Sequence, residues 1–195
     1  MIKTFEFYFD FGSPYAYLAH KEIKKIENIY KIKIKYMPVF LGGLHKILGI
    51  EAPASIPLKA KFMIRDCKLW AEKNKINFKF NTYFPIISLN LMRGVIFSEK
   101  EKLDSIYIDK FYDAIWKDGL NLNDQSIVEK ILKNLDINPK IFFQSIEQEQ
   151  IKNDLKIRTD DAIKNGVFGV PTYFVNNKIF WGQDRLEFAI NEAKK

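Results

Sequence analysis

Strand patterns occur only near the two ends of this chain, and that distribution constrains its fold more than any other feature. In "KTFEFYFDF", phenylalanines alternate with less apolar residues, which is the two-residue period of a strand with one apolar face. A second alternating run, "KIKIKYMPVF", occupies residues 31–40. The last two runs, "PTYFV" and "KIFWG", begin only at Pro171. Between these regions the periodicity is helical.

The first strand leads directly into a helix. The strand ends at Gly12, and apolar residues recur at helical spacing from Pro14 to about Tyr30. Proline is tolerated in the first helical turn, and Ser13 stands at the N-cap position. Because a helix connects them, the first two strands are expected to be parallel.

The middle and the end of the chain complete the order of elements. Helices are expected at residues 57–73, 87–99, 103–117, 124–135 and 138–150, with a further helix closed by Gly166. The adjacent Asn176 and Asn177 tolerate positive φ, so a tight hairpin is expected between the last two strands. Asp184 is expected to cap a terminal helix.

This order of elements is the connectivity of an α/β fold, a thioredoxin-like domain interrupted by an all-helical domain. Residues 1–40 and 155–195 are expected to form the discontinuous thioredoxin-like domain, and residues 41–154 the helical insertion. In such domains the first helix begins where its unpaired N–H groups and dipole stabilise a thiolate. Redox members carry a CxxC motif there, but this chain has Ser13 at the first cysteine position and Ala16 at the second. Disulfide exchange on the protein itself is therefore excluded, whereas an external thiol could accept a hydrogen bond from Ser13.

Composition narrows the possible functions. The one cysteine, Cys67, excludes an intramolecular disulfide and fits a core position in a protein of the reducing cytoplasm. The net charge of +7 comes from lysines spread along the chain without a nucleic-acid motif, so no nucleic-acid partner is expected. No stretch approaches the roughly 20 apolar residues that cross a bilayer, and no secretory signal is recognisable. His20 and His45 lack companions at metal-ligand spacing, so no metal is expected.

Three segments together resemble a known family. They are "FYFDFGSPYAYLA", "IPLKAKFMIRDCKLWA" and "GVFGVPTYFVNNKIFWGQDRLEFA", which span nearly the whole chain. In these segments the chain is similar to the 2-hydroxychromene-2-carboxylate isomerases and kappa-class glutathione transferases, which share the DsbA-like fold. The resemblance implies glutathione as cofactor and a homodimer.

The resemblance also assigns the thiol site. Ser13 would contact the glutathione sulfur, and Val170 would pair with the cysteinyl backbone beside a cis Pro171. Gln183 and Asp184 would lie at another helix start, where Asp184 would hold the γ-glutamyl amino group. Ser13 and Asp184 are also ordinary N-cap residues, and capping does not exclude ligand binding.

Further residues follow from the same resemblance. Lys59 matches a lysine near the glycyl carboxylate, although it is also one of many surface lysines. The family usually has an asparagine shortly before this lysine, whereas this chain has Ile50 there. Arg93 resembles an arginine that faces the cleft and holds a substrate carboxylate; the alternative is a structural ion pair. The aromatic residues that would line an apolar substrate pocket, or else belong to the core, are Tyr15, Tyr36, Phe40 and Trp181.

The predicted activity is isomerisation of an anionic, aromatic-derived 2-oxo acid or its cyclic hemiketal. A thiolate would add reversibly to a conjugated carbon, allow rotation about the resulting single bond, and leave again, so that glutathione is regenerated. Two alternatives remain open. One is a kappa-class-like transferase or peroxidase that consumes glutathione, and the other is a non-catalytic, DsbA-like peptide-binding module.

Overall fold

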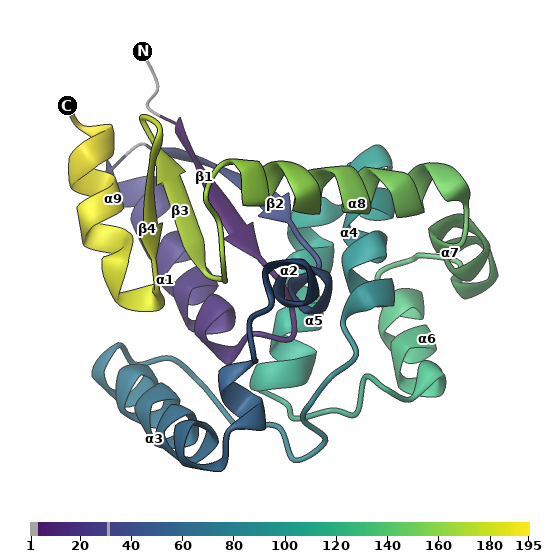
Figure 1. Ribbon diagram of the computed structural model, residues 1–195. Coiled ribbons are helices and arrows are strands. Elements are labelled where there is room, and N and C mark those ends of the chain that lie inside the picture. Colours follow the sequence, from purple (N-terminus) through teal and green to yellow (C-terminus); the bar gives the residue numbers. More distant parts are fainter. Residues whose placement is uncertain (1–3, 31) are drawn as a thin grey trace.

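The two ends of the chain build one four-stranded sheet. The computed structural model describes residues 4–30 and 32–195, and its sheet has the order β2-β1-β3-β4 (Figure 1). The strands are β1 (Thr4–Phe9), β2 (Lys33–Pro38), β3 (Thr172–Val175) and β4 (Lys178–Trp181). As predicted, β2 is parallel to β1, and β3 and β4 form a hairpin. Strand β3 is antiparallel to β1. Lys3 and Lys31, with which two of the predicted strands begin, lie outside the described residues.

Aromatic side chains set the register of the central strands. Phe7 of β1 lies opposite Tyr36 of β2 on one side and Tyr173 of β3 on the other. Its ring centroid is 5.2 Å from that of Tyr36 and 5.6 Å from that of Tyr173. Such cross-strand aromatic contacts stabilise a sheet. A slip of one residue would turn Phe7 to the other face, so the alternating pattern fixes the register.

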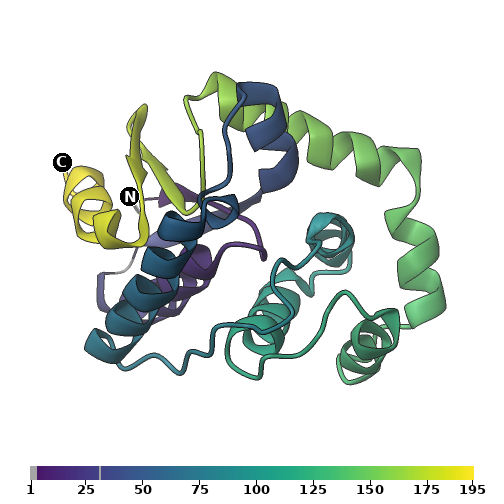
Figure 2. The ribbon, with the colours of Figure 1, turned by 60° about the horizontal axis from the view of Figure 1, so that its bottom comes forward.

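Helices surround this sheet and extend to one side of it. In the sheet part, α1 (Pro14–Tyr30) and α8 (Glu149–Lys164) pack on β2, and α9 (Leu186–Ala193) packs on β3 and β4. The remaining helices are α2 (Leu41–Leu48), α3 (Pro57–Lys73), α4 (Leu89–Lys100), α5 (Asp104–Trp116), α6 (Gln125–Lys133) and α7 (Pro139–Ile146). Helices α4 to α7 gather at the side away from α9, whereas α3 lies next to α1 (Figures 1 and 2). Within the described part of the chain, no helix is long and apolar enough to cross a membrane.

Buried polar contacts join α5 to the sheet part. His20 of α1 is fully buried, and its ring nitrogens lie 2.7 Å from the Tyr36 hydroxyl and 2.7 Å from an Asp109 carboxylate oxygen. Burial lowers the pKa of His20, although Asp109 opposes this shift. The Trp116 indole N–H donates to the carbonyl of Phe11, at 2.8 Å. These bonds hold α5 beside the start of α1.

One predicted helix ends earlier in the structure than expected, and one helix was not predicted. The helix expected at 138–150 ends at Ile146, and α8 begins at Glu149 after Gln148 adopts an extended backbone. This break lets α7 pack on α4 and α6 while α8 continues toward β2. Helix α2 was missed because Gly42 and Gly43 disfavour a helix. The Phe40 ring packs against both glycines, and a Cβ at Gly43 would lie 2.8 Å from it.

The terminal helix also starts differently from the prediction. A short 3-10 helix, η2 (Gln183–Arg185), follows β4, and Arg185 rather than Asp184 stands at the N-cap position of α9. Gly182 has a φ of 111°, which turns the chain sharply out of the strand. The remaining predicted helices agree with the structure at their ends to within a few residues.

Gly94 provides a test of packing between α4 and α5. The Tyr107 hydroxyl lies over this glycine and donates to the carbonyl of Leu91, at 3.1 Å. A Cβ at position 94 would overlap the Tyr107 hydroxyl and lie 2.7 Å from the Phe142 ring. Both aromatic residues are buried, so neither has free space to move into.

We therefore expect Gly94→Ala to lower the free energy of unfolding by about 1–3 kcal/mol, as overpacking of a core does. Urea denaturation measures this change. Lys100→Ala, at the exposed end of the same helix, is the control and should change stability by less than about 0.5 kcal/mol. Equal stability of the two variants would show that α4 tolerates a side chain at position 94.

Candidate thiol-binding site

Ser13 lies between β1 and α1, directly before the first residue of the helix. Its side-chain oxygen accepts a hydrogen bond from the N–H of Ala16, at 3.2 Å, which confirms the predicted N-cap. Its hydroxyl donates to the carbonyl of Val170, at 3.1 Å. Pro14 has no N–H to satisfy, so it fits the first position of the helix. The serine is 5% exposed. Its bond to Val170 joins the start of α1 to a distant part of the chain.

The segment before β3 has a defined conformation. The Val170–Pro171 peptide bond is cis. The Pro171 carbonyl accepts a hydrogen bond from the N–H of Gly182, at 2.9 Å, and the Thr172 hydroxyl donates to the carbonyl of Gly169, at 2.7 Å. These two bonds fix the conformation of the segment, and the Ser13 bond ties its Val170 to the start of α1.

An aromatic pair flanks this segment. The Trp181 indole lies over Gly169, where an added Cβ would approach its nitrogen to 2.9 Å. The Phe168 ring lies 4.9 Å from the Trp181 ring, and both side chains are partly exposed. The predicted pocket residue Trp181 thus lies next to Val170, and only glycine fits beneath its ring.

Helix η2 brings two more predicted residues to the same end of α1. Gln183 and Asp184 belong to η2, which packs on α1 and follows the Gly182 bond to Pro171. Asp184 is partly exposed and forms an ion pair with Arg185, at 3.0 Å. The structure therefore brings together the predicted thiol-site residues of the two chain ends.

Helix α3 also packs on α1. Lys59 is exposed in its first turn. Tyr15, in the first turn of α1, lies beside Asp66 and Cys67 of α3; burial raises the pKa of its hydroxyl, and the neighbouring Cys67 and Asp66 raise it further. Cys67 is fully buried, and burial raises the pKa of its thiol. Cys67 is therefore the core residue that was predicted, and its thiolate is disfavoured.

Phe40 lies directly before α2, and Arg93 lies in α4. The Phe40 N–H donates to the Thr159 hydroxyl, at 3.0 Å, and the ring covers the start of α2. Arg93 of α4 forms an ion pair with Glu147, at 3.0 Å, and also contacts Asn90. The acidic neighbour considered for Arg93 is thus Glu147, which follows α7.

The sequence analysis missed Asp10, a fully buried carboxylate three residues before Ser13. One carboxylate oxygen accepts from the N–H of Gly12, at 2.7 Å, and the other from the N–H of Leu41, the first residue of α2, at 2.8 Å. Ser88, the N-cap residue of α4, also bonds to it through its side chain. Three helix starts therefore meet at one carboxylate. The available signal was a single charge within the apolar run around Phe9.

Burial raises the pKa of Asp10 above its ordinary range, although the bonds from Leu41, Ser88 and Gly12 oppose the shift. Between the ordinary and the raised value, the folded protein keeps a proton that the unfolded chain has lost. Stability should therefore fall as the pH rises through this interval.

We expect Asp10→Asn to remove this dependence. Urea denaturation of both proteins from about pH 4 to pH 7 measures it. The free energy of unfolding of the unmodified protein, relative to that of the variant, should decline with rising pH. A difference that stays constant would contradict a raised pKa at this position.

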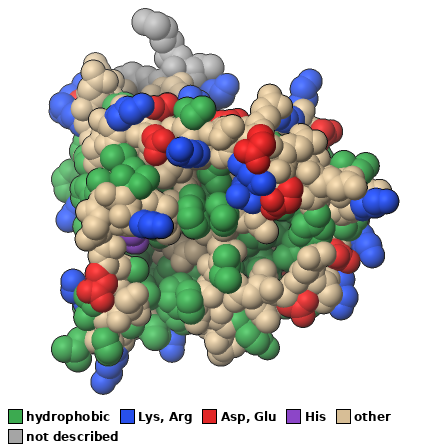
Figure 3. Space-filling model, turned by 45° about the vertical axis from the view of Figure 1, so that its right-hand side comes forward, with side chains coloured by type: hydrophobic (Ala, Val, Ile, Leu, Met, Phe, Trp, Pro, Cys, Tyr) green, Lys and Arg blue, Asp and Glu red, His purple; other side chains and the backbone are tan. Residues whose placement is uncertain are grey.

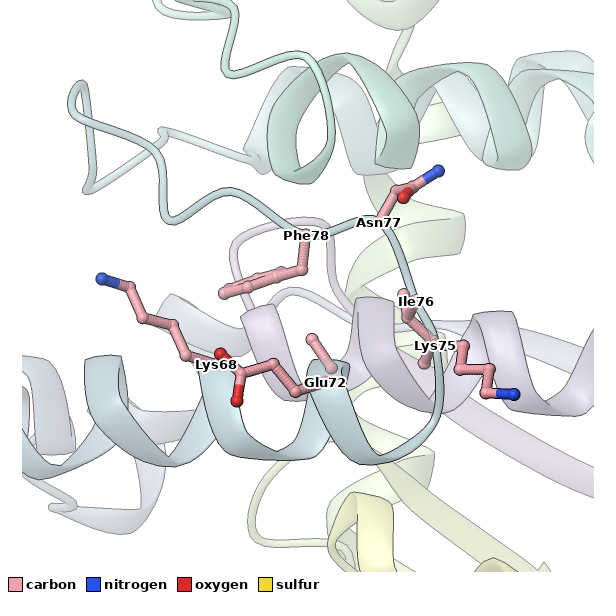
Figure 4. A pocket seen from close by; sticks show the side chains of 7 residues that line it. Lys68, Glu72, Lys75, Ile76, Asn77 and Phe78 are labelled. Carbon is pink, nitrogen blue, oxygen red and sulfur yellow. The ribbon is translucent and has the colours of Figure 1, made fainter.

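Two hollows lie elsewhere. One of about 400 Å³ lies between the second half of α3 and the segment that follows it (Figure 4). Figure 4 shows the Phe78 ring lying over α3, with Lys68 and Lys75 pointing outward. The other, of about 220 Å³, shares Lys75, Ile76 and Asn77 with the first. The second hollow is also lined by Lys117, the C-cap residue of α5, whose positive charge complements the dipole of that helix. None of the predicted site residues lines either hollow.

The surface has mixed charge. On the face shown in Figure 3, basic and acidic side chains are interspersed, and hydrophobic side chains gather around its centre. Within the described ranges, no group of three or more His, Cys, Asp or Glu side chains is arranged to hold a metal ion.

The fold and the site together define a thioredoxin-like protein whose first helix begins with serine instead of cysteine. More specifically, the chain belongs to the family of the DsbA-like thioredoxin domain, whose family model matches residues 4–192.

Several proteins are similar to this chain over nearly its whole length. A 2-hydroxychromene-2-carboxylate isomerase of Pseudomonas putida is 28% identical over 183 residues, covering 93% of this chain and 89% of the relative. One of Sphingobium xenophagum is 26% identical and covers 96% of each chain. Glutathione S-transferase kappa 2 of Caenorhabditis elegans is 26% identical, with 94% and 88% covered. A solved 2-hydroxychromene-2-carboxylate isomerase superposes with a TM-score of 0.85 at 26% identity, covering 95% of this chain and 91% of that one.

Proposed function

We propose that this protein is a glutathione-dependent isomerase that acts on an anionic, aromatic-derived 2-oxo acid or its cyclic hemiketal. The observation that carries the proposal is the contact between the Ser13 hydroxyl and the Val170 carbonyl, beside cis Pro171 and at the start of α1. A hydroxyl donor and the backbone carbonyl to which it is bonded thus lie together at a helix start, and this arrangement supports the binding of a peptide thiol there. The isomerases named above are similar over nearly the whole chain, which supports this reaction.

The residues around Ser13 fit the parts of glutathione. The Ser13 hydroxyl and the first N–H groups of α1 would stabilise negative charge on a sulfur atom. Val170 precedes β3, so its backbone is available to an extended peptide. Asp184 would exchange Arg185 for the γ-glutamyl ammonium, and Lys59 would attract the glycyl carboxylate. Ile50 has no side-chain amide such as an asparagine would offer, so the contacts named above would have to hold the peptide.

When bound, glutathione supplies a thiolate that adds reversibly to a conjugated carbon and leaves unchanged after rotation about the intervening bond. The protein contributes no nucleophile of its own, because Cys67 is buried and Ser13 serves as a donor. Its Ser13 hydroxyl holds the thiol in its ionised form at the helix start. A cationic side chain orients the anionic substrate. Arg93 would have to exchange Glu147 for the substrate, whereas Lys59 is already exposed.

The proposal includes the reducing cytoplasm, where glutathione stays a thiol, and a homodimer. The second candidate function is that of a kappa-class-like transferase. The 26% identity of this chain to a kappa transferase favours it. An isomerase leaves the total thiol concentration constant during turnover, whereas a transferase or peroxidase lowers it. A thiol assay of the reaction mixture therefore separates them.

Ser13→Ala tests thiol activation. We expect the pKa of glutathione to fall in the complex with the unmodified protein and to return toward its free value, by about one unit or more, in the variant. The absorbance of the thiolate against pH measures this. An unchanged pKa in the variant would show that Ser13 only caps α1, and the loss of the cap alone should cost about 1 kcal/mol of stability.

Lys59→Ala tests the carboxylate contact separately. We expect glutathione to bind about fivefold or more weakly, because a charge-assisted contact is lost, while the pKa of the bound thiol stays unchanged. Calorimetry measures the affinity. Lys61→Ala, two residues along the same helix, is the matched control and should bind normally. Equal losses in the two variants would indicate general electrostatic attraction instead of a contact at Lys59.

A further inference from the structure

The Ser13 hydroxyl has a single proton, and this proton already takes part in a hydrogen bond within the protein. It is donated to the carbonyl of Val170, at 3.1 Å, while the oxygen accepts from the N–H of Ala16. A hydroxyl has one donor hydrogen. Ser13 cannot therefore donate fully to a sulfur atom until it turns away from Val170.

Turning away leaves the Val170 carbonyl without its donor. Val170 is 7% exposed and lies before β3, so the sheet ladder does not supply an N–H to its carbonyl. A buried carbonyl without a donor is costly. Activation of a thiol by Ser13 is thus opposed unless something else donates to Val170.

A cysteinyl peptide carries both groups that this exchange needs. The amide N–H and the sulfur of a cysteinyl residue are separated by only two carbon atoms. The two protein atoms that would receive and give the hydrogen bonds, Val170 O and Ser13 Oγ, lie 3.1 Å apart. One residue of ligand can therefore donate to the carbonyl while its sulfur accepts from the released hydroxyl.

We propose that the Ser13–Val170 hydrogen bond makes thiol activation conditional on an amide N–H in the ligand, so that the site ionises acylated cysteinyl thiols and not simple thiols. This inference rests on the proposed function and specifies the ligand class of the same site. It assigns Ser13 and Val170 a joint part in specificity. A thiol without the amide N–H would bind beside a serine that stays bonded to Val170.

The test compares glutathione with its analogue methylated at the cysteinyl amide nitrogen, which keeps the sulfur and both carboxylates. Calorimetry gives the affinity of each, and thiolate absorbance at saturation gives the pKa of each bound thiol relative to the free one. We expect methylation to lower the ionisation constant of the bound thiol about tenfold in the unmodified protein. In Ser13→Ala, methylation should leave the ionisation constant unchanged, because no hydroxyl remains to be released.

The outcomes separate this inference from the proposed function. Equal shifts for both ligands in the unmodified protein, with glutathione bound and ionised, would overturn the inference alone. An effect of methylation that persists in Ser13→Ala would also overturn it, since the effect would not pass through the hydroxyl. Absence of glutathione binding would overturn the proposed function and the inference together.

Discussion

The arrangement around Ser13 depends on one buried carboxylate. Asp10 receives N–H groups from the turn before α1 and from the first residue of α2, and it receives the side chain of the residue that precedes α4. Its own backbone carbonyl accepts from the N–H of Ser13, at 3.1 Å, and from the Tyr112 hydroxyl of α5, at 3.3 Å. A buried polar group that satisfies so many donors specifies one arrangement of the segments that supply them. The Asp10 carboxylate therefore fixes how the starts of α2 and α4 lie relative to the turn that leads to Ser13.

The missing cysteines change the chemistry of the site without changing its framework. The strand, the turn, the helix start and the cis proline are all present, but a reactive sulfur at this helix start would have to come from a ligand. A protein of this kind can keep its own single cysteine buried, as Cys67 is. Under the proposed function, the helix start serves as a binding site whose reactivity is set by what it binds. An isomerase and a kappa transferase are both similar to this chain over nearly its whole length.

Much of this could be predicted from the sequence. The alternation of aromatic residues predicted the strands. The position of the candidate site was indicated by Ser13, Pro14 and the Val170–Pro171 pair. The failures have physical causes outside the local pattern. Helix α2 contains two glycines that only the Phe40 ring makes acceptable, and the break before α8 follows from the different partners of α7 and α8. Asp10 could not be placed because its donors come from residues as distant as Leu41 and Ser88. The cis peptide bond between Phe84 and Pro85 had no signal beyond the proline itself.

The two residues that meet at the site are 157 positions apart in the chain. Because synthesis runs from the N-terminus, Ser13 leaves the ribosome long before Val170 does. The start of α1 is therefore without its partner until the segment around Val170 has been made. Because β3 must also insert beside β1 before the two residues touch, a growing or truncated chain presents a serine at a helix end but no site. The proposed thiol site is thus completed only when β3 joins β1.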